Sequence, residues 1–302
     1  MEARSDAASA PMRTRFVAEV SSNHHASLAR CLDFVDCAAD VGCDAVKFQL
    51  FRVRDLFAPE ILERSAAHRA REAWELPEAF LPELAARARA RGLAFACTPF
   101  SLAAVDALAP FVDFYKIASY ELLWTPLLEA CARHGRPVVL STGMADEGEI
   151  ERALRALDAA GATAITLLHC VSGYPTPPAE ANLAAIDALR ALARRALGRA
   201  IDVGWSDHSV SPGVVQRAVH RHGAAMIEFH LDLDGAGEEF AAGHCWLPDA
   251  IAAVIRDVRA GESADGTGAK RPSPSECADR AWRADPGDGL RPLRAIRAGF
   301  RA

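Results

Sequence analysis

Eight short apolar segments alternate with amphipathic segments along most of this 302-residue chain. The apolar segments cover residues 16–20, 45–50, 94–98, 114–117, 137–141, 164–170, 201–206 and 226–231. Between them, apolar residues recur on one helix face, as in residues 28–40, 80–91, 147–160 and 213–222. Uniformly apolar strands separated by helices are typical of a parallel sheet that helices cover on its outer face. Eight such units in about 250 residues predict a (β/α)8 TIM barrel.

Turn residues fit this alternation. A helix C-cap favours glycine with positive φ, and a glycine lies between a helix and the next strand at Gly42, Gly92, Gly135, Gly161 and Gly223. Ser27, Ser101 and Asp146 precede helices as N-caps, and Asp146 with Glu149 has the capping-box pattern. The alternative fold is an open doubly wound sheet. Its dinucleotide-binding form needs a glycine-rich turn after the first strand, and residues 21–25 do not supply one.

Composition divides the chain into three parts. Residues 1–15 mix charged and small residues, unlike a signal or transit peptide, and we expect them to form a flexible leader. The barrel is expected over residues 16–262. Gly, Ser, Pro, Arg and Asp then dominate, so residues 263–302 are expected to form an irregular tail that packs on the barrel. No apolar run approaches the ~20 residues that span a bilayer.

Charge and cysteine usage argue against some classes of function. The net charge is −6 and no long basic run is present, so neither nucleic acid nor a membrane surface is an expected partner. The 8 cysteines form no C-x-x-C pair, which fits reduced thiols in a cytoplasmic enzyme. Of the 34 basic residues, only Lys47, Lys116 and Lys270 are lysines. Lys47 and Lys116 close strand-like segments, where a compact ammonium suits a phosphate or carboxylate in a deep pocket; chance is the alternative explanation.

Polar residues gather at the ends of the predicted strands, where a (β/α)8 barrel builds its active site. They include Glu19, Lys47, Gln49, Thr98, Lys116, Ser119, Ser141, Ser206, His208, Glu228 and His230. Lysines, hydroxyls, carboxylates and histidines at one rim predict a site for a phosphorylated anion beside a metal. His208 and His230 end the seventh and eighth strands, and two adjacent imidazoles can bind a divalent metal. Two histidines that merely cap strands are the alternative.

Short motifs at these strand ends follow one another in a specific order. They are Phe16-Val17-Ala18-Glu19 with Asn23-His24, Asp44-Ala45-Val46-Lys47-Phe48-Gln49, Thr98-Pro99-Phe100, Tyr115-Lys116-Ile117-Ala118-Ser119, Leu140-Ser141-Thr142-Gly143-Met144, Leu168-His169-Cys170 with Tyr174-Pro175-Thr176, Ser206-Asp207-His208 and Ile227-Glu228-x-His230. In this set, which extends over most of the expected barrel, the chain resembles the sialic acid synthase (N-acetylneuraminate synthase) family.

The resemblance implies condensation of phosphoenolpyruvate with an open-chain aldose such as N-acetylmannosamine, giving a sialic-acid-like 3-deoxy-2-keto sugar acid and phosphate. It implies a divalent metal, usually Mn²⁺ with Mg²⁺ or Co²⁺ as alternatives, bound by His208 and His230. The catalytic residues it implies are Glu19, Glu228, Lys47 and Lys116, and the division of roles between the two carboxylates is left open. The substrate-binding residues it implies are Thr98, Ser119, Ser141 and Ser206 for phosphoenolpyruvate, Gln49, Phe100 and Tyr174 for the aldose, and Ser172.

The chain departs from the family's pattern near the expected aldose site. Ser172 stands where the family often has Asn, and His25-Ala26 replace Asn-Gly. After the eighth strand, the family's Gly-Pro-Asp-His, whose acid binds the aldose, is replaced by residues 237–246. Candidates for that acid's role are Glu238, Glu239 and His244, and a simply solvated loop is an equal alternative.

The C-terminal region departs further. Many family members continue into an antifreeze-like domain that supplies an arginine to the partner subunit's aldose site, and residues 270–276 resemble only the linker before it. We expect that arginine to be absent or replaced from the tail, with Arg283, Arg291 and Arg294 as candidates. A homodimer of barrels is left open.

Two other functions remain as alternatives. A pyruvate aldolase or lyase on the same barrel would use one buried neutral lysine to form a Schiff base, whereas two lysines with hydroxyls favour a phosphate. A non-catalytic relative that senses phosphoenolpyruvate would need neither the whole set of charged residues nor both histidines.

Overall fold

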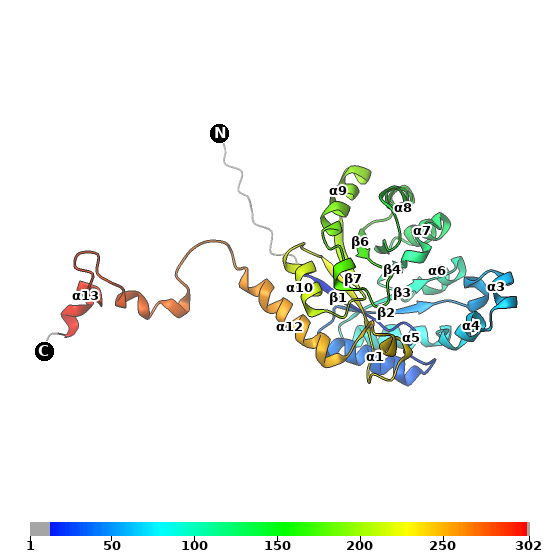
Figure 1. Cartoon of the computed structure of the whole chain (residues 1–302), viewed down its shortest axis with the longest axis horizontal. Coiled ribbons are helices and arrows are strands. Elements are labelled where there is room, and N and C mark those ends of the chain that lie inside the picture. Colours follow the sequence, from blue (N-terminus) through cyan, green and yellow to red (C-terminus); the bar gives the residue numbers. More distant parts are fainter. Residues whose placement is uncertain (1–12, 301–302) are drawn as a thin grey trace. The chain divides into compact units, whose positions relative to one another are not determined.

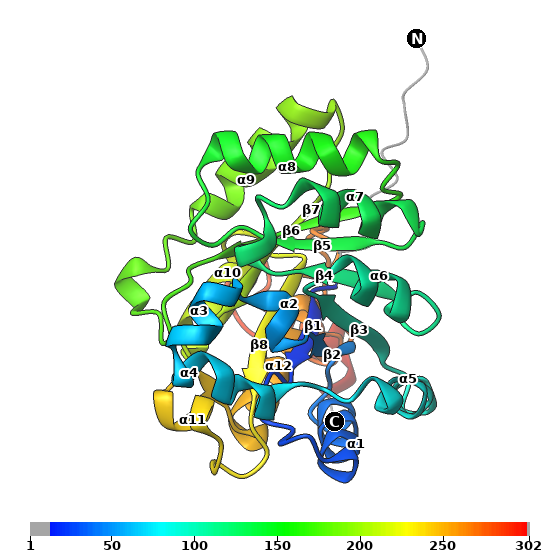
Figure 2. The same cartoon turned by 90° about the vertical axis from the view of Figure 1, so that its right-hand side faces the viewer.

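The computed structural model describes residues 13–300, and the part up to Glu262 forms a closed barrel of eight parallel strands (Figures 1 and 2). The strands are β1 (Arg15–Glu19), β2 (Ala45–Leu50), β3 (Ala94–Pro99), β4 (Phe114–Ile117), β5 (Val138–Ser141), β6 (Ile165–Cys170), β7 (Asp202–Asp207) and β8 (Met226–Leu231). Each strand pairs with the next, and β1 pairs with β8 in a register that sets Glu19 beside His230. The predicted (β/α)8 barrel is therefore confirmed, and the open doubly wound sheet is wrong because β8 pairs back with β1 and closes the sheet.

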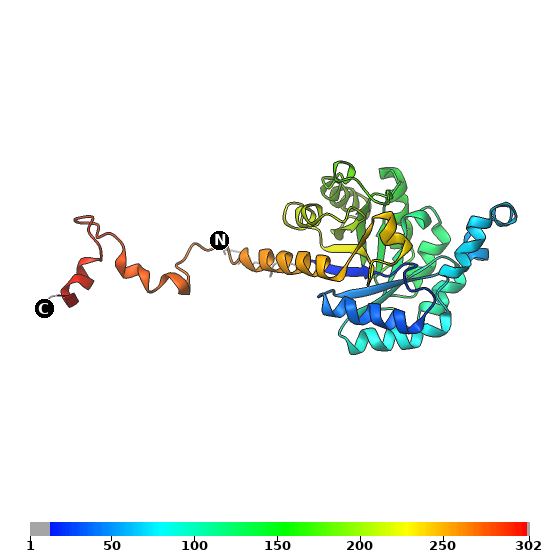
Figure 3. The same ribbon diagram turned by 60° about the horizontal axis from the view of Figure 1, so that its bottom comes forward.

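Helices cover the outside of the barrel. They are α1 (Leu28–Asp40), α5 (Leu81–Ala90), α6 (Leu102–Leu108), α7 (Thr125–Arg133), α8 (Glu147–Ala159), α9 (Ala185–Leu197), α10 (Pro212–His220) and α12 (Pro248–Ala264). α1 and α5 lie side by side, and Arg87 of α5 reaches Asp36 of α1 at 2.5 Å (Figure 3). The predicted caps are present, since Ser27 and Ser101 accept backbone N–H groups of α1 and α6 and Asp146 forms a capping box with Glu149.

Two apolar layers hold this arrangement together. The larger lies between the strands and the helices, where side chains such as Phe34, Leu84 and Trp205 are completely buried. The smaller fills the barrel interior with Val17, Ala45, Ala96, Phe114, Val139, Leu168 and Met226. Gly204 of β7 belongs to this close packing, because a Cβ there would overlap the carbonyl oxygen of Met226 on β8. Polar residues occupy the rest of the interior, toward the carboxyl ends of the strands.

Two insertions follow the carboxyl ends of strands. After β2 come α2 (Val53–Leu56), α3 (Pro59–Arg64), α4 (Ala66–Arg69) and the 3₁₀ turns Ala70–Trp74 and Glu78–Phe80. After β8 come α11 (Glu238–Ala242) and β9 (Cys245–Trp246), a two-residue strand that pairs with β8. The apolar pattern did not predict these elements, because each is too short to show a full helical period.

The remaining parts of the chain are described separately. Of the expected leader, residues 1–12 lie outside the described part, while Thr14 is buried and Arg15 begins β1. Residues 263–300 form a second unit with short helical turns, including α13 (Arg294–Arg297), and the predicted packing of the tail on the barrel stays a prediction. Among residues 13–300, no helix combines the length and the apolar character needed to cross a membrane.

Candidate active site

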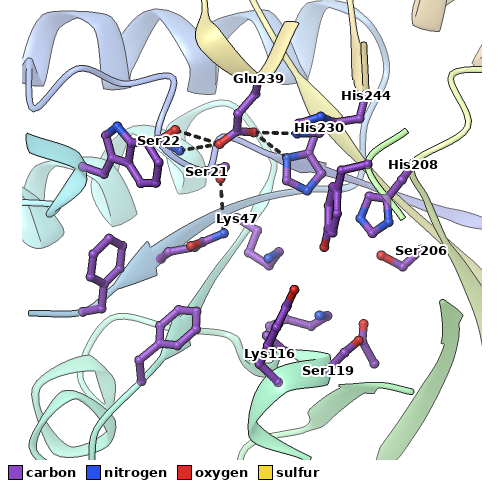
Figure 4. Close-up of a pocket in the computed structure, with 18 of the residues that line it drawn as sticks. Ser21, Ser22, Lys47, Lys116, Ser119, Ser206, His208, His230, Glu239 and His244 are labelled. Carbon is purple, nitrogen blue, oxygen red and sulfur yellow. Dashed lines mark hydrogen bonds and ion pairs between the residues drawn. The ribbon is translucent and has the colours of Figure 1, made fainter. Parts of the chain in front are cut away.

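A pocket of about 940 Å³ opens at the carboxyl ends of the strands (Figure 4). Most of the predicted site residues line it, namely Lys47, Gln49, Phe100, Lys116, Ser119, Ser141, Tyr174, Ser206, His208, Glu228 and His230. Residues from at least six different strands or strand ends thus meet in one cavity, as expected for a barrel of this kind.

Three predicted residues lie behind the pocket wall. Glu19 is buried and accepts a hydrogen bond from Gln49 Nε2 at 2.9 Å. Thr98 is also buried, with Oγ1 3.3 Å from Lys47 Nζ. Ser172 lies against Gly143, where any Cβ would overlap the Ser172 hydroxyl. These three residues therefore contact other predicted site residues, or the loop beside them, rather than the open cavity.

Four alternating charges lie at the pocket floor and directly behind it. Lys47 forms an ion pair with Glu19, and its Nζ lies 3.8 Å from Oε1 of Glu228. Lys116 Nζ lies 3.4 Å from the same oxygen. Both lysines are nearly inaccessible, at 3% and 2% exposure, so the ammonium groups are held away from bulk water.

Burial and these charges shift the pKa values in opposite directions. Burial acts to lower the pKa of Lys47, but Glu19 and Glu228 outweigh it and raise that pKa. Burial lowers the pKa of Lys116, and the charge of Lys47 adds to this effect against the pull of Glu228. Burial acts to raise the pKa of Glu228, yet Lys116 and Lys47 hold it below its ordinary value. Lys47 and Glu228 are consequently charged, whereas Lys116 is the more easily deprotonated lysine.

Buried polar atoms without partners face the same region. Within residues 13–300, neither Ser141 Oγ nor Glu228 Oε2 has a hydrogen-bond partner. Ser206 donates to Oε1 of Glu228 at 3.3 Å, and Ser119 Oγ accepts the Gly143 N–H at 2.9 Å. Since buried polar groups in proteins are almost always hydrogen-bonded, these atoms indicate that a polar ligand completes the site.

The two predicted metal ligands lie side by side. The rings of His208 and His230 have centroids 5.3 Å apart, and the Tyr174 ring is 4.1 Å from that of His208. Nδ1 of His208 lies 2.9 Å from the Val171 carbonyl oxygen, and Nδ1 of His230 lies 2.8 Å from Oε2 of Glu239. Each ring therefore keeps Nε2 for another partner, so the donor set fits a divalent metal.

The structure adds pocket residues that the sequence did not single out. Glu121 lines the pocket beside Lys116, and burial raises its pKa to about 7. Arg71 lines it from the insertion after β2, with its guanidinium 5.4 Å from the Phe57 ring and 5.2 Å from the Trp74 ring. Glu121 lies two residues after the motif at the end of β4, so a search limited to the strand ends does not reach it. No sequence pattern around Arg71 points to a functional site.

The loop after β8 is ordered by its own contacts and is not simply solvated. Asp232 is completely buried, and Arg30 forms ion pairs with Asp232 at 3.3 Å and Asp234 at 2.9 Å. Glu238 lines the pocket, as do Glu239 and His244. The residues proposed to replace the family's acid thus lie at the pocket, and one of them already binds His230.

A profile of the NeuB family matches residues 34–270. The chain belongs to this family. N,N'-diacetyllegionaminic acid synthase of Campylobacter jejuni is 34% identical over 87% of this chain and 81% of that protein. Spore coat polysaccharide biosynthesis protein SpsE of Bacillus subtilis is 31% identical over 85% of this chain and 69% of that protein.

The solved structures agree with this assignment. N-acetylneuraminic acid (sialic acid) synthetase from Leptospira borgpetersenii superposes with a TM-score of 0.76 and 30% identity, covering 88% of this chain and 90% of that one. The resemblance predicted from the strand-end motifs is therefore confirmed, and this NeuB-family chain is an enzyme of the sugar-acid synthase class.

Proposed function

We propose that this NeuB-family enzyme condenses phosphoenolpyruvate with an open-chain aldose related to N-acetylmannosamine, in a metal-dependent reaction in the cytoplasm. The product is a sialic-acid-like 3-deoxy-2-keto sugar acid. The observation that carries the proposal is the pair Lys47 and Lys116, the only lysines of the barrel, buried on either side of Glu228 at the pocket floor. Two ammonium groups beside unpartnered hydroxyls suit the phosphate and carboxylate of phosphoenolpyruvate.

The reaction forms a carbon–carbon bond and a carbon–oxygen bond to water, and it breaks the carbon–oxygen bond to the phosphate. The methylene carbon of phosphoenolpyruvate attacks the aldehyde carbon, water adds to the carbon that bears the phosphate, and phosphate then leaves with its bridging oxygen. Glu228 faces the pocket and Glu19 supports Lys47 from behind, so Glu228 is the better placed to accept a proton from that water. His208 and His230 would hold the divalent metal, Mn²⁺ with Mg²⁺ or Co²⁺ as alternatives, which would polarise the aldehyde oxygen as a Lewis acid.

The aldose would occupy the wider part of the pocket, toward Gln49, Phe100 and Tyr174. Named relatives differ in their products: one is an N,N'-diacetyllegionaminic acid synthase and another, from mouse, an N-acetylneuraminate-9-phosphate synthase. A hexose with an N-acyl group is therefore the aldose class that we propose.

Release of phosphate from phosphoenolpyruvate tests this proposal. The panel contains N-acetylmannosamine, its 6-phosphate and 2,4-diacetamido-2,4,6-trideoxy hexoses, each with Mn²⁺ and with EDTA. We expect release that needs both an aldose and the metal. Tight binding of phosphoenolpyruvate with no release on any aldose would instead favour the non-catalytic alternative.

A pyruvate lyase that forms a Schiff base is the second candidate, because the depressed pKa of Lys116 eases deprotonation of its ammonium. Borohydride would then reduce a pyruvate adduct onto Lys116, and mass spectrometry of the digested protein would locate it. We expect no adduct, since the Glu228 carboxylate next to Lys116 and the nearby hydroxyls favour its charged ammonium form, which cannot form a Schiff base.

A further inference from the structure

The loop between β8 and β9 brings a carboxylate, Glu239, to the back of a predicted metal ligand (Figure 4). Gly237 permits this path: its N–H donates to Asp232 Oδ2 at 2.9 Å, and a Cβ on it would come within 2.5 Å of that oxygen and 2.6 Å of Asn23 Oδ1. Arg30 fixes the same segment through Asp232 and Asp234. Glu239 is thus placed by a constrained backbone rather than by a flexible loop.

The Glu239 carboxylate is held at both oxygens. Oε1 accepts hydrogen bonds from Ser22, at 2.7 Å from Oγ and 3.2 Å from the backbone nitrogen. Oε2 lies 2.8 Å from His230 Nδ1 and 3.5 Å from His244 Nε2. With Ser22 donating to one oxygen and the two imidazoles next to the other, the Glu239 carboxylate acts here as a hydrogen-bond acceptor.

An acceptor at this position determines which ring nitrogen of His230 carries the proton. A neutral imidazole that donates from Nδ1 leaves the lone pair on Nε2. The Val171 carbonyl oxygen, also only an acceptor, acts in the same way on His208. A metal-binding histidine whose other nitrogen donates to a carboxylate is fixed in tautomer and orientation and becomes a more basic ligand.

We propose that Glu239 is a positioning residue of the metal site, which holds His230 with Nε2 free before a cation binds. This proposal rests on the proposed function, since the metal itself belongs to that reaction. It also assigns a role to one of the three candidates for the position of the family's acid. Glu239 acts through His230, whereas Glu238 lines the pocket and forms no hydrogen bond or ion pair with His208 or His230 among the described residues.

Calorimetric titration of Mn²⁺ into the metal-free full chain tests the proposal without either substrate. Removing such a carboxylate partner weakens metal binding about 10–100-fold, and we expect this for Glu239→Gln. Glu238→Gln is the matched control and should keep the Kd of the wild-type protein. Ser22→Ala, which removes one anchor of the same carboxylate, should give a smaller weakening in the same direction and serves if Glu239→Gln does not fold.

A second measurement separates positioning from general support of the fold. In ¹⁵N-histidine NMR spectra of the metal-free protein, the wild type should show His230 with the proton on Nδ1, and Glu239→Gln should show a mixture of tautomers. An unchanged Mn²⁺ Kd and an unchanged tautomer in Glu239→Gln would overturn the proposal. If the wild-type chain binds none of Mn²⁺, Mg²⁺ and Co²⁺, the metal dependence of the proposed function fails as well.

Discussion

Lys116 on β4 and Glu228 on β8 form an ion pair across the barrel interior, with Nζ 3.4 Å from Oε1. Because three strands separate β4 from β8 in either direction around the barrel, only closure of the sheet brings these residues together. Glu228 also approaches Lys47 from β2, so one carboxylate oxygen lies between two ammonium groups. If phosphoenolpyruvate binds here as proposed, we expect both cations to contribute to its binding.

Replacing Lys116 by Met should therefore impair binding of phosphoenolpyruvate more than folding. A charged hydrogen bond contributes about 1.5–3 kcal/mol, which corresponds to a drop of about 10–100-fold in kcat/KM for phosphoenolpyruvate. Glu228 keeps Lys47 and Ser206 as partners, so the barrel should still fold. Steady-state phosphate release measures the effect. Lys270→Met, at an exposed lysine outside the barrel, is the control, and equal kinetics in the two variants would contradict the assignment.

Glu121 should give the reaction a pH dependence near neutrality. Burial raises its pKa to about 7, so its carboxyl group changes protonation state near neutral pH. We expect the profile of kcat/KM against pH to contain a limb near pH 7 that Glu121→Gln lacks. Glu129→Gln, on the exposed face of α7, should retain the limb, and a limb that persists in Glu121→Gln would rule out this carboxyl as its source.

The same pKa shift has a consequence for stability. Because the folded-state pKa lies above the ordinary value of 4.5, the folded protein binds a proton that the unfolded chain has lost between about pH 4.5 and pH 7. The contribution of Glu121 to the free energy of unfolding is thus fully present below pH 4.5 and declines as the pH rises to about 7. Urea unfolding at pH 5 and pH 8 should show a smaller decline for Glu121→Gln than for the wild type.

Arg71 is expected to select the aldose rather than phosphoenolpyruvate. It lies in the pocket wall, packed on Phe57 and Trp74, and none of the carboxylates in the described part of the chain forms an ion pair with it. Its guanidinium is therefore free to bind an anionic or polyhydroxylated end of the aldose. We expect Arg71→Leu to raise the KM for the aldose about tenfold with little change in the KM for phosphoenolpyruvate. Arg54→Leu, an exposed arginine of α2, should alter neither value.

How much the sequence could predict depends on where each residue lies. Lys47, His208 and His230 could be placed because they lie in or directly after the carboxyl-terminal parts of strands, which meet at one rim in a parallel barrel. How deep a side chain lies in the pocket could not be predicted. Thr98 lies near the end of β3 but behind Lys47, since the side-chain alternation of a strand gives a face and not a distance. Neither Arg71 nor the contact of Glu239 with His230 could be predicted, because both residues sit on short inserted elements. The paths of such elements depend on tertiary contacts such as the Arg30 ion pairs with Asp232 and Asp234.

Asp207 should be among the residues on which the stability of the barrel depends most. It precedes His208, is completely buried, and accepts the indole N–H groups of Trp205 and Trp246 at 3.0 Å each. Asp207→Ala would leave both buried indole groups without an acceptor. Each unsatisfied donor costs about 1–3 kcal/mol, so we expect the free energy of unfolding to fall by about 2–6 kcal/mol.

Urea unfolding followed by tryptophan fluorescence and circular dichroism measures this loss. Asp202→Ala provides the comparison on the same strand. Asp202 is partly exposed, and its ion-pair partner within residues 13–300 is Arg15 at 3.3 Å, an interaction that contributes less than about 1 kcal/mol. If Asp207→Ala were as stable as Asp202→Ala, the two indole groups would have to find other acceptors.

The Asp207→Ala variant should also weaken Mn²⁺ binding. Asp207 accepts the backbone N–H groups of Ser209 and Val210 and so fixes the turn that carries His208.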